Sequence, residues 1–178
     1  MGGPRVFPGR YTAELGADGM VVVLIGMRFN HWWRVDKWLF VMLAMFRSLR
    51  HLADRDEGLL ANYTFLGGRT TLMVQYWRSM DELQKFASNP DAPHLAAWRR
   101  YVRRIGNDGS VGAYHEAYQV RPGGTDVVYV NMPAFGLAGA TAPVKVDAGR
   151  NTARQRVSYG TPEPPPASRA SEHTESGV

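Results

Sequence analysis

The sequence of 178 residues contains no cysteine. Disulfide bonds, thiolate metal sites and cysteine nucleophiles are therefore excluded, which agrees with a reducing compartment. The longest apolar run, residues 38–46, has nine residues, whereas a helix that crosses a bilayer needs roughly 20. Residues 1–8 have no apolar stretch of the kind that secretory signals contain. We expect a soluble, cytoplasmic protein without a membrane span.

Several catalytic signatures are missing as well. There is no glycine-rich phosphate loop, no Gly-x-Ser-x-Gly nucleophile elbow and no histidine pair at metalloprotease spacing. These absences argue against enzymes that use ATP or a nicotinamide cofactor. The net charge of +5 includes a cluster made of Arg99, Arg100, Arg103 and Arg104. No nucleic-acid-binding motif accompanies it, so we interpret it as a solvated helix face and expect no nucleic acid partner.

The composition is that of one folded domain followed by a tail. Hydrophobic residues make up 44% of the chain and charged residues 21%, which at this length is enough for one hydrophobic core. Residues 10–137 carry the periodic apolar patterns. Residues 138–178 are dominated by small, polar, charged and proline residues, which bury too little apolar surface to offset the entropy lost on ordering. We predict that this second range is a disordered tail.

Within residues 10–137 the apolar period changes repeatedly between that of a strand and that of a helix. Gly67-Gly68 indicates a hairpin, and Ser79 with Glu82 three residues later indicates a helix start. The predicted strands are residues 20–27, 59–66, 70–77, 111–120 and 126–130. The predicted helices are residues 32–54, 80–87 and a third one from after Asp91 to near Gly106. This order predicts an α+β, ferredoxin-like fold with an antiparallel sheet.

The first predicted strand is apolar on both faces. Val21, Val23 and Ile25 face one side, while Val22 and Leu24 face the other. A sheet covered by helices on one face normally alternates apolar and polar residues. Because this chain's helices can cover only one face, we predict that a second copy covers the other. The expected assembly is a homodimer.

Two histidines are the main candidates for chemistry. His94 falls in the first turn of the third helix, on the same face as Trp98 and Tyr101. There the helix dipole disfavours imidazolium, and a neutral imidazole is what a metal or haem iron needs. The alternative is a core histidine hydrogen-bonded to backbone. His115 lies in mid-strand beside Ala113 and Ala117, small residues that leave space for a pocket; its alternative is a cross-strand hydrogen bond.

Further candidates lie at strand ends, where open pockets are common. Arg28 could bind an anionic group, and Asn30 could donate to a substrate oxygen. Tyr76 and Trp77 close the third strand and are candidate substrate-binding residues, with Trp77 as a wall of the pocket. Trp98 is both a candidate substrate-binding residue and, like the other helix tryptophans, a candidate for core or subunit contact.

Five segments together resemble one family. They are Gly26-Met27-Arg28-Phe29-Asn30, Gln75-Tyr76-Trp77-Arg78-Ser79, His94-Leu95-Ala96-Ala97-Trp98, Tyr114-His115-Glu116-Ala117-Tyr118 and Tyr129-Val130-Asn131-Met132-Pro133. They look like DUF4188, also called the monooxygenase af470-like family. The likeness covers residues 10–137. It implies a dimeric α+β barrel, of the superfamily that contains antibiotic-biosynthesis monooxygenases, haem-degrading enzymes and chlorite dismutases.

Two narrower resemblances concern the histidines. The stretch from His94 to Tyr118 is similar to the C-terminal part of haem-containing aldoxime dehydratases, which implies His94 as iron ligand and His115 as distal acid–base. Asn30, Trp77 and His94 also occupy places like the Asn, Trp and His of small monooxygenases. The first resemblance implies haem, whereas the second often implies no cofactor.

The sequence thus supports three functional hypotheses. The first is a monooxygenase-like oxidoreductase that acts on a small aromatic or polyketide-like substrate, with His94 or His115 as base and with Asn30 and Arg28 steadying the oxyanion. The second is a haem enzyme with His94 on the iron. The third is a non-catalytic barrel that binds a ligand or haem.

Overall fold

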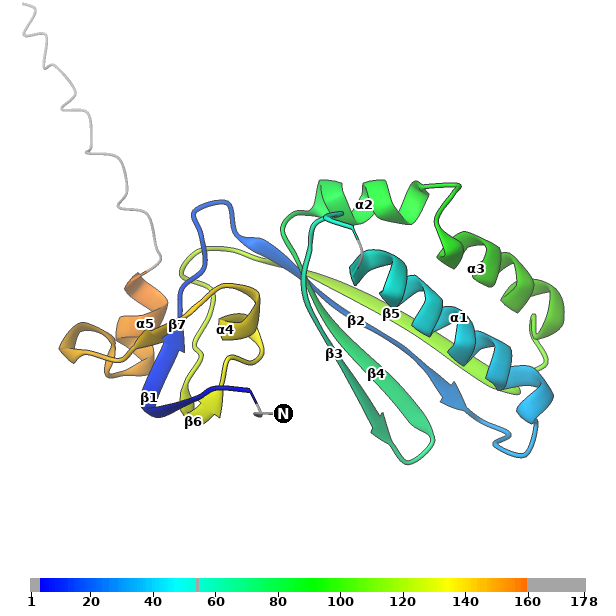
Figure 1. Cartoon of the computed structure of the whole chain (residues 1–178), viewed down its shortest axis with the longest axis horizontal. Coiled ribbons are helices and arrows are strands. Elements are labelled where there is room, and N and C mark those ends of the chain that lie inside the picture. The colour runs from blue at the N-terminus through cyan, green and yellow to red at the C-terminus, as the bar shows by residue number, and fades with distance from the viewer. Residues whose placement is uncertain (1–3, 54, 160–178) are drawn as a thin grey trace, which may run out of the picture.

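The computed structural model describes residues 4–53 and 55–159. Its central unit is a four-stranded antiparallel sheet with three helices on one face (Figure 1). In chain order the elements are β2 (Met20–Phe29), α1 (Val35–Ala53), β3 (Leu59–Gly67), β4 (Thr70–Trp77), α2 (Met80–Ser88), α3 (Pro93–Arg104) and β5 (Val111–Val120). The strand order β3-β4-β2-β5 is ferredoxin-like, which confirms the predicted fold class.

The local signals act as expected at two junctions. Gly68 turns the β3–β4 hairpin with φ of 56°, a region that glycine enters without steric cost. Ser79 caps α2, because its hydroxyl accepts a hydrogen bond from the Glu82 backbone N–H at 3.1 Å. The Glu82 carboxylate does not reach back to the cap. It accepts from Arg78 at 2.7 Å instead, so only half of a capping box forms.

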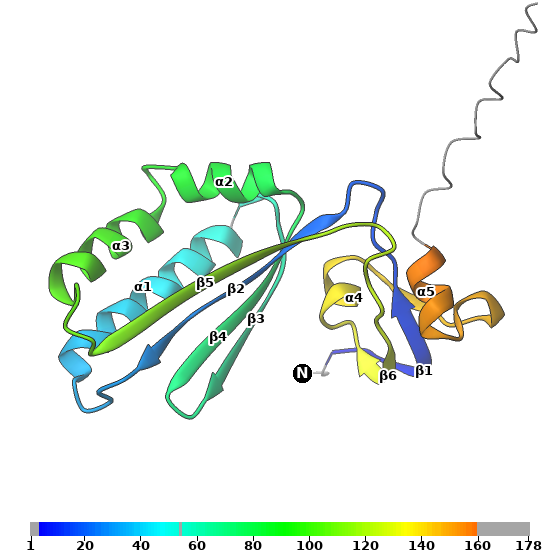
Figure 2. The ribbon, with the colours of Figure 1, turned by 180° about the vertical axis from the view of Figure 1, so that it is seen from behind.

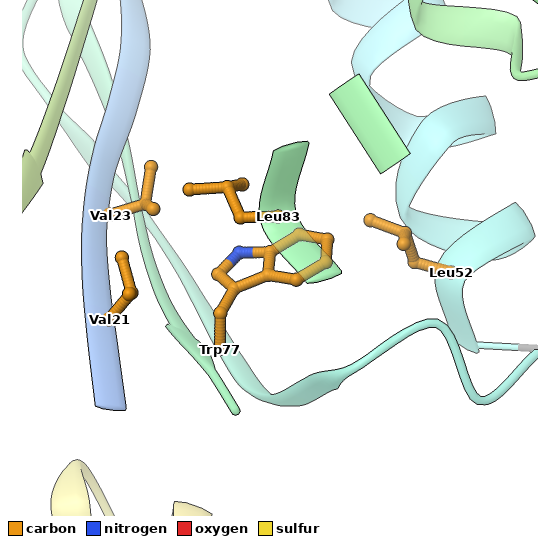
Figure 3. Packing of buried hydrophobic residues seen from close by; sticks show 5 residues of the cluster. All are labelled: Val21, Val23, Leu52, Trp77 and Leu83. Carbon is orange, nitrogen blue, oxygen red and sulfur yellow. The ribbon is translucent and has the colours of Figure 1, made fainter. Parts of the chain in front are cut away.

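One end of the core forms around Trp77, whose side chain is completely buried. Figure 3 shows its indole between Val21 and Val23 of β2, Leu83 of α2 and Leu52 of α1. The ring also packs against Phe86, with 5.4 Å between ring centroids. Trp77 therefore joins the sheet to two helices.

The rest of the chain forms a smaller unit beside the first (Figure 2). It contains β1 (Val6–Ala13), β6 (Tyr129–Pro133), α4 (Leu137–Ala140), β7 (Pro143–Lys145), the 3₁₀ turn η1 (Ala148–Arg150) and α5 (Ala153–Tyr159). These strands make a three-stranded sheet in the order β6-β1-β7. The last predicted strand, residues 126–130, is displaced toward the C-terminus and pairs with β1 rather than with the main sheet.

Regular elements continue beyond the predicted boundary at residue 137, through residues 138–159. β7 adds to β1, and Arg156, whose side chain is 7% exposed, pairs with Asp126 at 2.6 Å. Arg150 is held between Glu14 and Asp147. Backbone pairing and the ion pairs of these two largely buried arginines hold this segment, and neither depends on apolar periodicity. The remainder of the predicted tail, residues 160–178, lies outside the described residues.

The second face of the main sheet carries no helix of the central unit. Val22, Leu24 and Val74 are only partly buried there. The segment around α4 covers one end, where Leu137 and Ala138 pack with Met20. The sheet is thus apolar on both faces, as the sequence indicates. Most of this second face is not covered by the described residues of the chain.

The outer side of α1 is also apolar. Leu39, Leu43 and Phe46 of this 19-residue helix are exposed, although its inner side packs on the sheet. In the part of the chain that the structure describes, no helix is both long and apolar enough to cross a bilayer.

The loop that joins α3 to β5 is fixed by Asp108. Its carboxylate accepts from the Ser110 hydroxyl at 2.6 Å and from the Ser110 backbone N–H at 2.8 Å. Lys37 of α1 lies 3.1 Å from the other carboxylate oxygen. These contacts, above all the Ser110 hydroxyl, lower the pKa of Asp108 from its usual 3.8 to about 2.

Asp108 should therefore make stability depend on pH in the acid range. Because its pKa is lower in the folded than in the unfolded chain, the carboxylate stabilises the fold above about pH 4, and this contribution is lost as pH falls toward 2. Urea unfolding should show that Asp108→Asn loses more stability near neutral pH than at about pH 3. Asp18→Asn, in the exposed turn before β2, is the control. An equal loss for Asp108→Asn at both pH values would contradict the assignment.

Candidate functional site

A cavity of about 440 Å³ lies between the helices and the covered face of the sheet. Its size is within the usual range for small-molecule sites. The walls are almost entirely apolar. They come from β2 (Ile25, Gly26, Met27), α1 (Val41, Ala44, Met45, Ser48, Leu49, Leu52), β4 (Met73, Gln75, Trp77), α2 (Leu83, Phe86, Ala87), α3 (His94, Leu95, Ala97, Trp98, Tyr101) and β5 (Ala113, Tyr114, His115).

The structure brings His94 and His115 to this one cavity. His94 arrives from the first turn of α3 and His115 from the edge strand β5, opposite Ile25 of β2. The two residues are 21 positions apart in the sequence and belong to different elements. Titratable groups that converge in an apolar cavity are the usual mark of a functional site.

His94 has one ring nitrogen engaged and one available. Nε2 lies 3.0 Å from the Ala87 carbonyl oxygen. The ring packs against Phe86, with 4.5 Å between ring centroids. A carbonyl oxygen only accepts, so Nε2 carries the proton of this hydrogen bond. Nδ1 is buried and has no partner among the described residues. With the proton on Nε2, Nδ1 is a hydrogen-bond acceptor in the wall of the cavity.

His115 lies at the open side of the cavity. Its side chain is exposed and has no hydrogen-bond partner within residues 4–53 and 55–159. Ala113, on the same face of β5, is exposed as well. Both residues are part of the cavity lining.

Gln75 is a polar cavity residue that the candidate set missed. Its Oε1 accepts from the Trp77 indole N–H at 3.1 Å, and its side chain is nearly buried. With Oε1 occupied in this way, the amide NH₂ is the group left to donate to a bound molecule. Gln75 shares its sheet face with Trp77 by strand alternation, and that signal was present in the sequence.

Three candidates are not in this cavity. Arg28 is exposed and donates to the Thr70 hydroxyl at 3.2 Å, because alternation turns it away from Met27. Asn30 lies beyond the end of β2 and donates to the Gly109 carbonyl at 2.9 Å. Tyr76 faces the opposite side of the sheet from its neighbour Trp77. There its ring packs against that of Tyr63, with 6.2 Å between ring centroids. The structure therefore does not place these three side chains beside the two histidines.

The two tryptophan candidates do line the cavity. Trp77 is completely buried, whereas Trp98 is 55% exposed and stacks on Tyr101 with 5.3 Å between ring centroids. The Tyr101 hydroxyl donates to the Val111 carbonyl at 2.6 Å and so ties α3 to β5. Burial raises the pKa of Tyr101 above its usual 10.0, which keeps the phenol neutral at physiological pH.

The residues around His94 do not fit haem coordination. Nε2, the nitrogen that usually faces a haem iron, is hydrogen-bonded to the Ala87 carbonyl. The described cavity wall also contains no Arg or Lys that would pair with haem propionates. To bind a haem iron, the His94 ring would have to break its hydrogen bond to Ala87 and rotate so that Nε2 faces the cavity.

Solved structures of two kinds of enzyme align with this chain. Aldoxime dehydratase in complex with butyraldoxime aligns with a TM-score of 0.58 and 18% identity, over 80% of this chain and 43% of that protein. SnoaB, a cofactor-independent oxygenase from Streptomyces nogalater, aligns with a TM-score of 0.42 and 12% identity, over 58% of this chain and 94% of that one. At 18% identity the likeness to aldoxime dehydratase concerns the fold alone.

Sequence relationships are closer. Monooxygenase af470 of Aspergillus fumigatus is 31% identical over 138 residues, which are 69% of this chain and 46% of the fungal protein. The chain thus spans less than half the length of that relative. The profile of the monooxygenase af470-like family matches residues 20–137, the range that contains the cavity and both histidines. The chain belongs to the monooxygenase af470-like family.

Proposed function

We propose that this chain is a monooxygenase-like oxidoreductase that oxidises a small aromatic or polyketide-like molecule inside the cavity. The observation that carries this proposal is the meeting of His94 and His115 in one apolar cavity. An apolar wall suits an aromatic substrate and excludes water, while two imidazoles supply proton transfer. Family membership supports oxygen chemistry as the reaction type.

The proposed reaction needs only the substrate and dioxygen. Nδ1 of His94 removes a proton from the O–H of a phenolic substrate or from an activated C–H of a 1,3-dicarbonyl-like substrate, which leaves a carbanion whose charge is shared with an oxygen. The carbanion passes one electron to dioxygen, and recombination of the two radicals forms a C–O bond in a peroxide. His115 acts as the general acid and supplies a proton to the peroxide. Loss of water then leaves a new carbonyl, so that one oxygen atom enters the product and the other enters water.

Gln75 and the tryptophans would hold the substrate for this step. The Gln75 amide donates to the developing oxyanion, and its orientation is fixed by the Trp77 indole N–H. Of the two tryptophans that line the cavity, Trp98 offers an exposed indole face for an aromatic substrate, while the buried Trp77 holds Gln75 in place. This set replaces Arg28 and Asn30, whose side chains are engaged elsewhere.

A second copy completes the proposed enzyme. The apolar second face of the sheet, with Val22, Leu24 and Val74, is only partly covered by the α4 segment. Packing two such faces together would bury them, as the sequence pattern predicts. Equilibrium sedimentation of the full chain should give the mass of a dimer, and a monomer at all concentrations would refute this part.

Turnover with oxygen tests the proposal. The purified chain, treated with a chelator, should consume dioxygen and form a quinone from a phenolic substrate, detected by an oxygen electrode and by absorbance. Added haem should give no Soret band that depends on His94. A strong Soret band lost in His94→Ala would instead favour the haem enzyme. Tight binding of aromatic ligands without oxygen uptake would favour a non-catalytic carrier, which the size and apolar wall of the cavity would also permit.

A further inference from the structure

The outer side of α1 and the loop before it expose large apolar side chains. Trp32 and Trp33 are 58% and 60% exposed, and Leu39, Leu43 and Phe46 follow on α1. Spacings of four and three residues place the last three on one helix face. A solvent-facing helix side is normally polar. Such a contiguous apolar patch marks a contact with another surface.

The same side of the molecule is strongly basic. α1 and α3 together contain seven Lys and Arg residues and one acidic residue, Asp36, which is already paired with Arg34. Arg47, Arg50, Arg99 and Arg103 are exposed and have no acidic partner among the described residues. Arg47 and Arg50 lie within one turn of Phe46.

The two helices form one continuous outer layer. They pack side by side over the sheet (Figure 1), and Arg100 and Arg104 of α3 lie over the ring of Phe40 of α1, at 4.9 and 5.2 Å. The exposed apolar residues of α1 and the unpaired arginines of both helices therefore belong to one surface, which we call the α1–α3 outer surface.

We propose that the α1–α3 outer surface docks on an anionic lipid bilayer. Trp, Phe and Leu side chains insert at the level of the headgroups, and surrounding arginines pair with acidic headgroups. A second copy of this chain fits less well, because a symmetric contact would bring the unpaired arginines of both copies together. Docking here would also place the cavity, which the same two helices line, next to a reservoir of apolar molecules.

Vesicle flotation with the full chain tests this proposal. The chain should float with vesicles of phosphatidylcholine and phosphatidylserine, but not with phosphatidylcholine alone, and added salt should release it. Arg47→Gln and Arg50→Gln should each weaken binding about fivefold. Leu43→Ser with Phe46→Ser should weaken it at least about tenfold. Leu66→Ser, at a still more exposed leucine on the β3–β4 hairpin, is the control and should float like the unchanged chain.

A measurement on the unchanged chain guards against variants that fail to fold. Brominated lipids in the anionic vesicles should quench the emission of Trp32 and Trp33, and Trp32→Phe with Trp33→Phe should remove most of that quenching. Failure of the unchanged chain to float or to be quenched would overturn the proposal. Two other results would also overturn the proposal. One is self-association of the chain that the double variant Leu43→Ser with Phe46→Ser abolishes, and the other is binding of an acidic protein in place of vesicles. In either case the surface would serve a contact between proteins. None of these measurements depends on oxidation. Their outcome is therefore independent of whether the proposed enzyme activity is correct.

Discussion

Replacing His94 with glutamine is expected to lower kcat by about 10²- to 10⁴-fold, the usual contribution of a positioned general base. Glutamine can still donate to the Ala87 carbonyl through its amide, so the α2–α3 corner keeps the hydrogen bond that His94 makes at 3.0 Å. What is lost is the unpartnered Nδ1. His115→Gln should reduce kcat by a similar factor if it supplies the second proton transfer. Oxygen uptake under saturating substrate measures both effects.

His31→Gln is the matched control for these variants. His31 is exposed, precedes α1 and does not line the cavity, so its replacement should leave kcat unchanged. Ligand affinity separates chemistry from binding, since His94→Gln should still bind the aromatic substrate. Full turnover in both cavity variants would rule out proton transfer by these histidines.

The largest effect on stability is expected at Trp77. Its side chain is fully buried among Val21, Val23, Leu52 and Leu83 (Figure 3). Trp77→Ala should lower the free energy of unfolding by about 3–5 kcal/mol, because it removes this packing and leaves a void beside the existing cavity. Trp77→Phe keeps much of the ring but leaves Gln75 without its donor, which should cost about 1 kcal/mol. Urea unfolding followed by circular dichroism measures both changes.

An exposed tryptophan provides the comparison. Trp33 is 60% exposed, and Trp33→Ala should change the free energy of unfolding by no more than about 0.5 kcal/mol. Trp77→Phe should in addition loosen the orientation of Gln75 and lower kcat. If Trp77→Ala were as stable as Trp33→Ala, the packing described for the sheet and helices would be incorrect.

The strands and helices of the central unit were predictable because their apolar residues repeat with clear periods. β4 and β5 begin and end where the sequence pattern places them. The smaller sheet was not predictable in this way. β1 and β7 are held by pairing between residues 130 or more positions apart, as between Tyr11 and Lys145, and no local pattern encodes such a partner.

The candidate site was predictable in part, and strand alternation explains the difference. His94 and His115 were identified from the faces they share with apolar or small neighbours, and the structure brings both to the cavity. Tyr76 and Trp77 are adjacent in one strand and must face opposite sides, so they could not both wall one pocket. The same rule separates Arg28 from Met27 and unites Gln75 with Trp77. Asn30 lies past the strand, where a loop contact with Gly109 decides its position.

The place of β1 in the smaller sheet has a consequence for folding. β1 is the middle strand, yet both of its neighbours, β6 and β7, come from beyond residue 128. During synthesis this first strand leaves the ribosome early and remains without either partner until the far end of the chain follows. The four-stranded unit can assemble in the meantime from segments closer together in sequence. The protein should therefore fold from its middle outward, with the two ends of the described chain joining last.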